Sequence, residues 1–272
     1  MVMNDLVAIP PVLPGIDGNS VILIAGGSGA IGSHAAAALS KMGARVAITG
    51  RSRERVDDCA HSVTYGGEVI GLVADITSSA QVKAAVESTM DRWGHIDGLV
   101  NLAAVSDSGR SLEDVDDDEI ATVLQTNLVG AIYLARACAD AMKKQAKGSI
   151  INVSSIGGHR VTPNRVTYGP AKAGLEHLSR QLAVELGNFG IRVNTMSPGQ
   201  TPSLLCHFDE TPGQAPVSSD PDGNPTPTRR IPLSRLGRFE DYVGVILFLL
   251  SDLASYVTGV NIWVDGGTSV LR

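Results

Sequence analysis

The stretch Val21-Ile22-Leu23-Ile24-Ala25-Gly26-Gly27-Ser28-Gly29-Ala30-Ile31-Gly32 decides the fold. Its first five residues are a compact apolar run that predicts a buried strand. Glycines follow at once, and the alanine-rich segment 34–39 predicts a helix that ends near Gly43. This order is typical of a dinucleotide site, because glycines let the backbone approach a pyrophosphate at the helix N-terminus. The alternative is a plain turn, since turns need glycine in any case.

The rest of the chain continues the alternation of strands and helices. Further strands are predicted at 45–49, 69–74, 99–102, 149–153, 191–196 and 260–264, and further helices at 81–93, about 120–134, 168–187 and 240–250. The alternation predicts an α/β fold: one doubly wound, Rossmann-like parallel sheet with helices on both faces, over residues 19–272. Residues 1–18 are expected to form a loose N-terminal arm. The proline-rich stretch 200–231 has almost no pattern and is predicted to be a substrate lid, with a disordered segment as the alternative.

Composition and charge exclude several classes of protein. The net charge of −6 and the absence of long basic runs argue against nucleic acid as a partner. The longest uninterrupted apolar run, Val245 to Leu250, is far too short to span a bilayer, so no membrane association is expected. Cys59, Cys138 and Cys206 are widely spaced and form no CxxC pair. They suit reduced thiols in a cytoplasmic protein, and no metal site is predicted.

A second motif follows the strand predicted at 149–153. Ser154 and Ser155 leave that strand at its carboxyl end, where open α/β sheets bind ligands. Tyr168 and Lys172 are four residues apart on the next helix, so they share one face. An ammonium beside a phenol favours the phenolate and lowers a pKa that is ordinarily about 10. Tyr168 could then exchange a proton near neutral pH. Taken alone, such a pair also arises by chance on protein surfaces.

At this point residues 21–267 resemble the short-chain dehydrogenase/reductase family, and within it the 3-oxoacyl reductases. The resemblance rests on ordered motifs: the glycine turn, Asp75, Asn101-Leu102-Ala103-Ala104, Asn127, Ser155, Tyr168-x-x-x-Lys172, Pro198-Gly199 and Asp265-Gly266-Gly267. Ser155 lies 13 residues before Tyr168, which is the family's usual separation. Ala25 and Ala30 depart from the family pattern, which has Thr and Gly at these places.

The resemblance implies an oxidoreductase that interconverts a carbonyl and a secondary alcohol by hydride transfer with a nicotinamide cofactor. Tyr168 would be the general acid or base, and Lys172 would lower its pKa and hold the nicotinamide ribose. Ser155 would bind the reacting oxygen, and Asn127 would position a water. The implied cofactor-binding residues are Gly26, Ser28, Gly29, Ala30, Ile31, Gly32, Arg51, Asp75, Ile76, Asn101, Ala103, Tyr168, Lys172, Pro198, Gly199, Thr201 and Ser203. Thr201 and Ser203 compete for one role.

Other expectations concern the substrate and the assembly. His159 has two interpretations, a substrate contact or an ordinary surface position, and the surface position is favoured. The substrate is a small molecule, with a 3-oxoacyl thioester and a sugar or polyol as the alternatives. A non-catalytic cofactor-binding protein is the alternative from another class. The family resemblance and the apolar helix at 240–250 predict a homotetramer, with a dimer as the fallback.

The choice of cofactor depends on the end of the second strand. The Rossmann pattern expects an acidic residue about 20 residues beyond the glycines, where it binds the ribose 2′-hydroxyl of NAD. Here that place holds Gly50, and Arg51 follows. Because a guanidinium matches the geometry of a phosphate, the prediction is NADP(H). NAD(H) is the alternative, since Gly29 stands where many NADP-using relatives carry a basic residue.

Overall fold

The computed structural model describes residues 13–201 and 231–271. Its centre is a seven-stranded parallel sheet in the order β3-β2-β1-β4-β5-β6-β7. The strands are β1 (Val21–Ala25), β2 (Arg45–Gly50), β3 (Val69–Val73), β4 (Gly98–Asn101), β5 (Gly148–Val153), β6 (Ile191–Pro198) and β7 (Asn261–Val264). The chain winds outward from β1 to β3, then crosses back to β4. Ligands bind at such a switch point in open α/β sheets.

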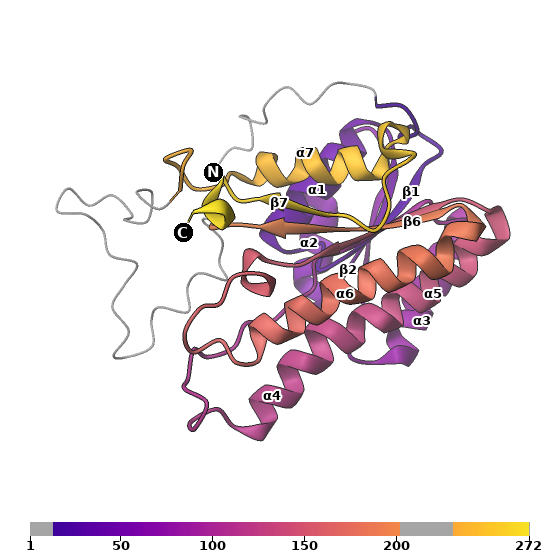
Figure 1. The fold of residues 1–272 in the computed structure, drawn as a ribbon. Coiled ribbons are helices and arrows are strands. Elements are labelled where there is room, and N and C mark those ends of the chain that lie inside the picture. Colours follow the sequence, from indigo (N-terminus) through magenta and orange to yellow (C-terminus); the bar gives the residue numbers. More distant parts are fainter. Residues whose placement is uncertain (1–12, 202–230, 272) are drawn as a thin grey trace.

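Helices cover both faces of this sheet, as Figure 1 shows. They are α1 (Ala30–Lys41), α2 (Arg53–Ser62), α3 (Ser79–Trp93), α4 (Asp117–Leu124), α5 (Gly130–Gln145), α6 (Tyr168–Leu186) and α7 (Phe239–Leu250). Helices α1, α2 and α7 pack on one face, and α3, α5 and α6 pack on the other. The predicted doubly wound α/β fold is therefore confirmed.

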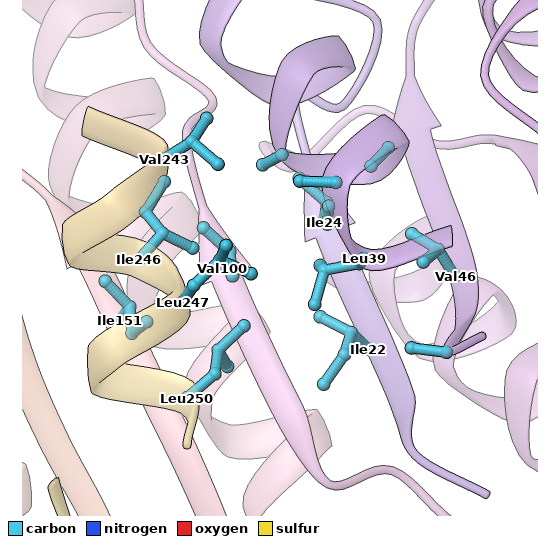
Figure 2. Close-up of a cluster of buried hydrophobic side chains, with 14 of the residues drawn as sticks. Ile22, Ile24, Leu39, Val46, Val100, Ile151, Val243, Ile246, Leu247 and Leu250 are labelled. Atoms are coloured by element: carbon cyan, nitrogen blue, oxygen red, sulfur yellow. The ribbon is translucent and has the colours of Figure 1, made fainter. Parts of the chain in front are cut away.

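The core between α1, α7 and the sheet is built from aliphatic side chains (Figure 2). The sheet contributes Ile22, Ile24, Val46, Val100 and Ile151, α1 contributes Leu39, and α7 contributes Val243, Ile246, Leu247 and Leu250. Four consecutive alanines of α1, residues 35–38, are fully buried. Their small side chains let α1 lie close to both α7 and the strands, which accounts for the alanine-rich sequence behind the glycine turn.

The described end of the predicted N-terminal arm is packed rather than loose. Ile16 is only 3% exposed and joins the core beside α1 and α7. The N–H of Asp252 also donates to the carbonyl of Pro14, at 2.8 Å. These contacts correct the expectation of a loose arm for residues 13–18. The remainder of the arm, and nearly all of the predicted lid at 200–231, lie outside the described residues.

Two further features were not predicted as elements. Helix α2 is polar and buries only Val56 and Ala60, one turn apart, so it lacks the broad apolar stripe by which a helix is recognised. The helix predicted at about 120–134 is interrupted by a π-helical segment, Gln125–Val129, between α4 and α5. Such segments are frequent at functional sites.

Other sequence predictions can be compared with the described residues. Cys59 and Cys138 are free thiols, and burial raises the pKa of Cys138 to about 12. Within residues 13–201 and 231–271, no helix combines the length and apolar character needed to cross a bilayer. The same residues contain no cluster of three or more His, Cys, Asp or Glu side chains arranged to hold a metal ion.

Candidate active site

A cleft of about 1550 Å³ runs along the carboxyl edge of the sheet. It extends from the glycine turn after β1, past the end of β2, to the start of α6. Its walls contain these predicted site residues: Gly26, Ser28, Gly29, Ala30, Ile31, Gly32, Arg51, Asp75, Ile76, Ala103, Ser155, Tyr168, Lys172, Pro198, Gly199 and Thr201. Asn101 and Asn127 lie behind the described walls, and Ser203 is outside the described residues.

The glycine turn is folded tightly enough to require glycine. A Cβ on Gly32 would lie 2.6 Å from the carbonyl oxygen of Gly26, so the backbone of α1 rests directly on the turn. Gly29 caps α1 without a side-chain hydrogen bond. The first N–H groups of the helix therefore face the cleft with their partial positive charge, an arrangement that suits a pyrophosphate. These residues fit a dinucleotide.

Asp75 and Ile76 follow β3 and line the adjoining part of the cleft. The carboxylate of Asp75 accepts hydrogen bonds from the backbone N–H of Thr77, at 2.9 Å, and from its hydroxyl, at 2.7 Å. This local turn fixes Asp75 at the strand end. Its position is compatible with the implied contact to an adenine.

Lys172 lies beneath Tyr168 on the same face of α6, as the spacing of four residues predicts. Its side chain is almost completely buried, and its Nζ donates to the carbonyl of Val153 at 2.9 Å. The Nζ lies 5.7 Å from the centre of the Tyr168 ring. Burial lowers the pKa of Lys172 to about 8, against a smaller opposing effect of the Glu176 carboxylate. A cation held by one carbonyl in this way can act on the neighbouring phenol.

Ser155 and Tyr168 flank one point in the cleft. A Cβ on Gly157 would lie 3.4 Å from the Ser155 Oγ and 3.6 Å from the Tyr168 Cε1. The Ser155 Oγ accepts a hydrogen bond from the Gly157 N–H, which fixes its orientation. The Ser155 side chain and the Tyr168 ring therefore both lie beside Gly157 in the wall of the cleft.

His159 lies at the rim of the same cleft. It is exposed, and its ring packs against that of Trp263 with 4.5 Å between ring centres. The exposure agrees with the favoured surface position. A substrate contact stays an open alternative, because the residue also lines the cleft.

Asn127 occupies the middle of the π-helical segment and is 1% exposed. Its Oδ1 accepts from the backbone N–H of Val105, and its Nδ2 donates to the carbonyl of the same residue, both at 2.8 Å. The amide holds the segment after β4 in place behind the cleft wall.

Asn101 also supports the cleft from below. Its side chain is buried, and its Nδ2 donates to the Asn152 Oδ1 at 3.2 Å. The amide is therefore buried at the end of β4, next to β1, and does not line the described cleft. The adjoining Ala103 lines the cleft, in keeping with its small side chain.

Sequence reasoning missed two buried carboxylates near the site. Glu176 accepts hydrogen bonds from the hydroxyls of Ser154, at 3.0 Å, and Ser197, at 3.3 Å. It lies four residues after Lys172, so the same helical spacing that pairs Tyr168 with Lys172 predicts that Glu176 shares their face of α6. Asp107 is 3% exposed and lies in a polar stretch that gave no signal of burial.

The sheet order, and a cleft of this kind at its switch point, are typical of dinucleotide-binding α/β proteins. Residues 25–269 match a family model described as enoyl-(acyl carrier protein) reductase. The chain therefore belongs to the short-chain dehydrogenase/reductase family of NAD(P)-dependent oxidoreductases.

Similar proteins are matched over nearly their whole length. The 3-oxoacyl-[acyl-carrier-protein] reductase of Thermotoga maritima is 35% identical over 248 residues, which cover 91% of this chain and 96% of that protein. The 2-(S)-hydroxypropyl-CoM dehydrogenase 3 of Xanthobacter autotrophicus is 33% identical over 256 residues, covering 93% and 98%. The structure of NAD⁺-bound xylitol dehydrogenase is 32% identical with a TM-score of 0.86, covering 93% of this chain and 99% of that chain. These relatives are oxidoreductases of alcohols and ketones.

Proposed function

We propose that this protein is an NADP(H)-dependent oxidoreductase that interconverts a carbonyl and a secondary alcohol, with Tyr168 as the general acid or base. The observation that carries the proposal is the buried Lys172 ammonium beside the phenol of Tyr168, in the cleft that also holds the glycine turn. The cofactor, when bound, supplies or accepts the hydride, while the protein orients the reactants and handles the proton.

In this mechanism, the hydroxyl of Ser155 donates a hydrogen bond to the reacting oxygen, and Tyr168 gives that oxygen its proton during reduction. The reverse transfer operates in oxidation. Lys172 has a pKa of about 8, so it carries a positive charge in most molecules at neutral pH. Its bond to the Val153 carbonyl keeps the charge beside the phenol, where it favours the phenolate.

Replacement of Tyr168 by Phe tests this role. The change keeps the ring and removes the hydroxyl, so kcat should fall by about 10²–10⁴ while NADPH still binds. Tyr65 provides a matched control, because the Lys41 Nζ lies 4.7 Å from its ring centre at a site remote from the cleft. Tyr65→Phe should keep normal turnover. Near-normal turnover in Tyr168→Phe would refute the assignment.

The preference for NADP(H) is supported by the end of β2. A Cβ on Gly50 would lie 2.9 Å from the Val56 Cγ1 and 3.1 Å from the Ser28 Oγ, so an acidic side chain there would require both neighbours to shift. Arg51 is exposed and lines the cleft together with Arg55. One charge-assisted hydrogen bond to a 2′-phosphate is worth about 1.5–3 kcal/mol, or roughly a ten- to hundredfold preference. NAD(H) is the alternative.

Arg51→Ala tests the cofactor proposal. The ratio of kcat/KM for NADPH to that for NADH should fall by about ten- to a hundredfold in this variant. Arg53→Ala is the control, because Arg53 carries the same charge two residues later but pairs with Asp57 and does not line the described cleft. A wild-type preference for NADH, or equal changes in both variants, would contradict the proposal.

The substrate class has two candidates. The similarity to a 3-oxoacyl-[acyl-carrier-protein] reductase favours a 3-oxoacyl thioester, and the similarity to xylitol dehydrogenase favours a polyol. Both substrate types contain the carbonyl or secondary alcohol that the geometry of Ser155 and Tyr168 requires. A panel of ketones, thioesters and polyols, followed by nicotinamide absorbance, decides between them.

A homotetramer in the cytoplasm completes the proposal. Helix α7 already buries most of its apolar side chains within the chain, so its composition alone gives less support for assembly than the sequence indicated. Assembly is supported instead by apolar side chains that the single chain leaves exposed: Trp263, Val270 and Leu271. The free thiols of Cys59 and Cys138 suit a reducing compartment.

A further inference from the structure

Asp107, in the segment after β4, is a buried carboxylate on which three donors converge. Its Oδ1 accepts from the Arg165 Nη1 at 2.6 Å. Its Oδ2 accepts from the Thr167 hydroxyl at 3.2 Å and from the backbone N–H of Tyr168 at 3.0 Å. The Asp107 side chain is 2% exposed. All three donors belong to the four residues that lead into α6.

The start of α6 depends on this carboxylate. Thr167 is the N-terminal capping residue, yet its side chain makes no capping hydrogen bond. The N–H of Gly169 donates to the Arg165 carbonyl at 3.3 Å, and Pro170 has no N–H. Asp107 therefore satisfies the first N–H of the helix, that of Tyr168, and its negative charge faces the positive end of the helix.

The same segment is held at its other end by Asn127. The amide of Asn127 makes two hydrogen bonds to the backbone of Val105, two residues before Asp107. Residues 105–107 thus connect the π-helical segment to the start of α6. Arg165 supplies the opposite charge without which a carboxylate buried here would be strongly unfavourable.

We propose that Asp107 is a positioning residue, which fixes the backbone of Tyr168 and thereby places its hydroxyl at the reacting oxygen. This inference rests on the proposed function of Tyr168. Proton transfer needs accurate placement, and a displacement of about 1 Å can lower a rate by about 10². Neither Asp107 nor Arg165 transfers a proton or binds the cofactor in this proposal.

The test compares Asp107→Ala with Asp116→Ala. Asp116 has matching chemistry at the start of α4, where it accepts from the Glu119 N–H and from the Arg110 Nη1, both at 2.7 Å. Asp107→Ala should lower kcat by about ten- to a hundredfold on the best substrate of the panel. Its Kd for NADPH should change by less than about threefold, which separates positioning from cofactor binding. Asp107→Asn keeps an oxygen for the Tyr168 N–H and should recover part of the rate.

A double-mutant cycle with Tyr168→Phe distinguishes positioning from general loss of structure. If Asp107 acts through the Tyr168 hydroxyl, Asp107→Ala should cause no further loss of rate in the Tyr168→Phe background. An equal loss in both backgrounds would overturn the proposal, as would normal turnover in Asp107→Ala.

Amide hydrogen exchange tests, without any substrate, whether Asp107 holds the start of α6 in place. Exchange at residues 168–172 should accelerate in Asp107→Ala and stay unchanged in Asp116→Ala. Unchanged exchange in Asp107→Ala would refute the anchoring. Failure of the wild-type protein to turn over any member of the panel would instead contradict the proposed function.

Discussion

Replacing Lys172 by Met should make the protein more stable and less active at the same time. The Lys172 side chain is almost fully buried, and burial lowers its pKa from 10.5 to about 8. One pKa unit corresponds to about 1.36 kcal/mol, so holding the protonated amine in the fold costs about 3 kcal/mol. Met fills a similar volume without charge but gives up the hydrogen bond to the Val153 carbonyl, worth about 1 kcal/mol. The expected gain is about 2 kcal/mol at pH 7.

This gain should depend on pH in a defined direction. Because the pKa is lower in the folded than in the unfolded chain, the unfolded chain binds more protons between about pH 8 and pH 10.5. The stability of the wild-type protein should therefore rise relative to that of Lys172→Met across this window. Below about pH 8 the full cost is present, and above about pH 10.5 the advantage of the variant should be gone.

Urea unfolding of the cofactor-free protein at pH 7 and pH 10 measures the effect. Lys41→Met is the control, because it makes the same substitution at an exposed position at the end of α1. Turnover of Lys172→Met should fall strongly, since the phenol loses its neighbouring cation. A variant that is less stable than wild type at pH 7, by an amount independent of pH, would refute the reasoning.

Three other outcomes are expected. Asn127→Ala leaves the N–H and carbonyl of Val105 without their side-chain partner. The free energy of unfolding, measured with denaturant, should therefore fall by about 1–3 kcal/mol, and turnover should decrease. Unchanged stability would contradict the described geometry. Gly32→Ala should abolish NADPH binding measured by fluorescence. Gly244→Ala should not, because a Cβ at Gly244 meets nothing within 4 Å. Normal NADPH binding by Gly32→Ala would show that the glycine turn does not bind the cofactor. Light scattering at micromolar concentration should give the mass of four chains, and the mass of one chain would exclude a stable tetramer.

The sequence predicted the sheet well because parallel strands buried on both faces are almost uninterrupted apolar runs. Val21 to Ala25 is of this kind, whereas the strand before Ser154 is fully buried but also contains Ser149 and Asn152. Helix α2 was missed for the opposite reason, since only Val56 and Ala60 are buried and most of its other side chains are polar. Ile16 belongs to the core although its neighbours Pro14, Gly15 and Asp17 suggest a loop.

The candidate site was only partly predictable. Tyr168 and Lys172 lie on one helix, so their spacing carries the information that brings them together. Asp107 and Arg165 are 58 residues apart in the chain, and their contact depends on how the segment after β4 reaches the start of α6. A single Asp in a polar stretch gives no sign of such a partner. Periodicity within one element cannot reveal contacts between loops.

The packing of α7 against α1 has a consequence for biosynthesis. The glycine turn and α1 leave the ribosome early, but the face of β1, β4 and β5 that carries Ile22, Val100 and Ile151 is covered by a helix that ends at Leu250. During synthesis this apolar face has no native partner until nearly the whole chain has emerged. Nascent chains that stop before residue 239 would expose it and should require a chaperone or aggregate. The native core can therefore form only after α7 has been synthesised.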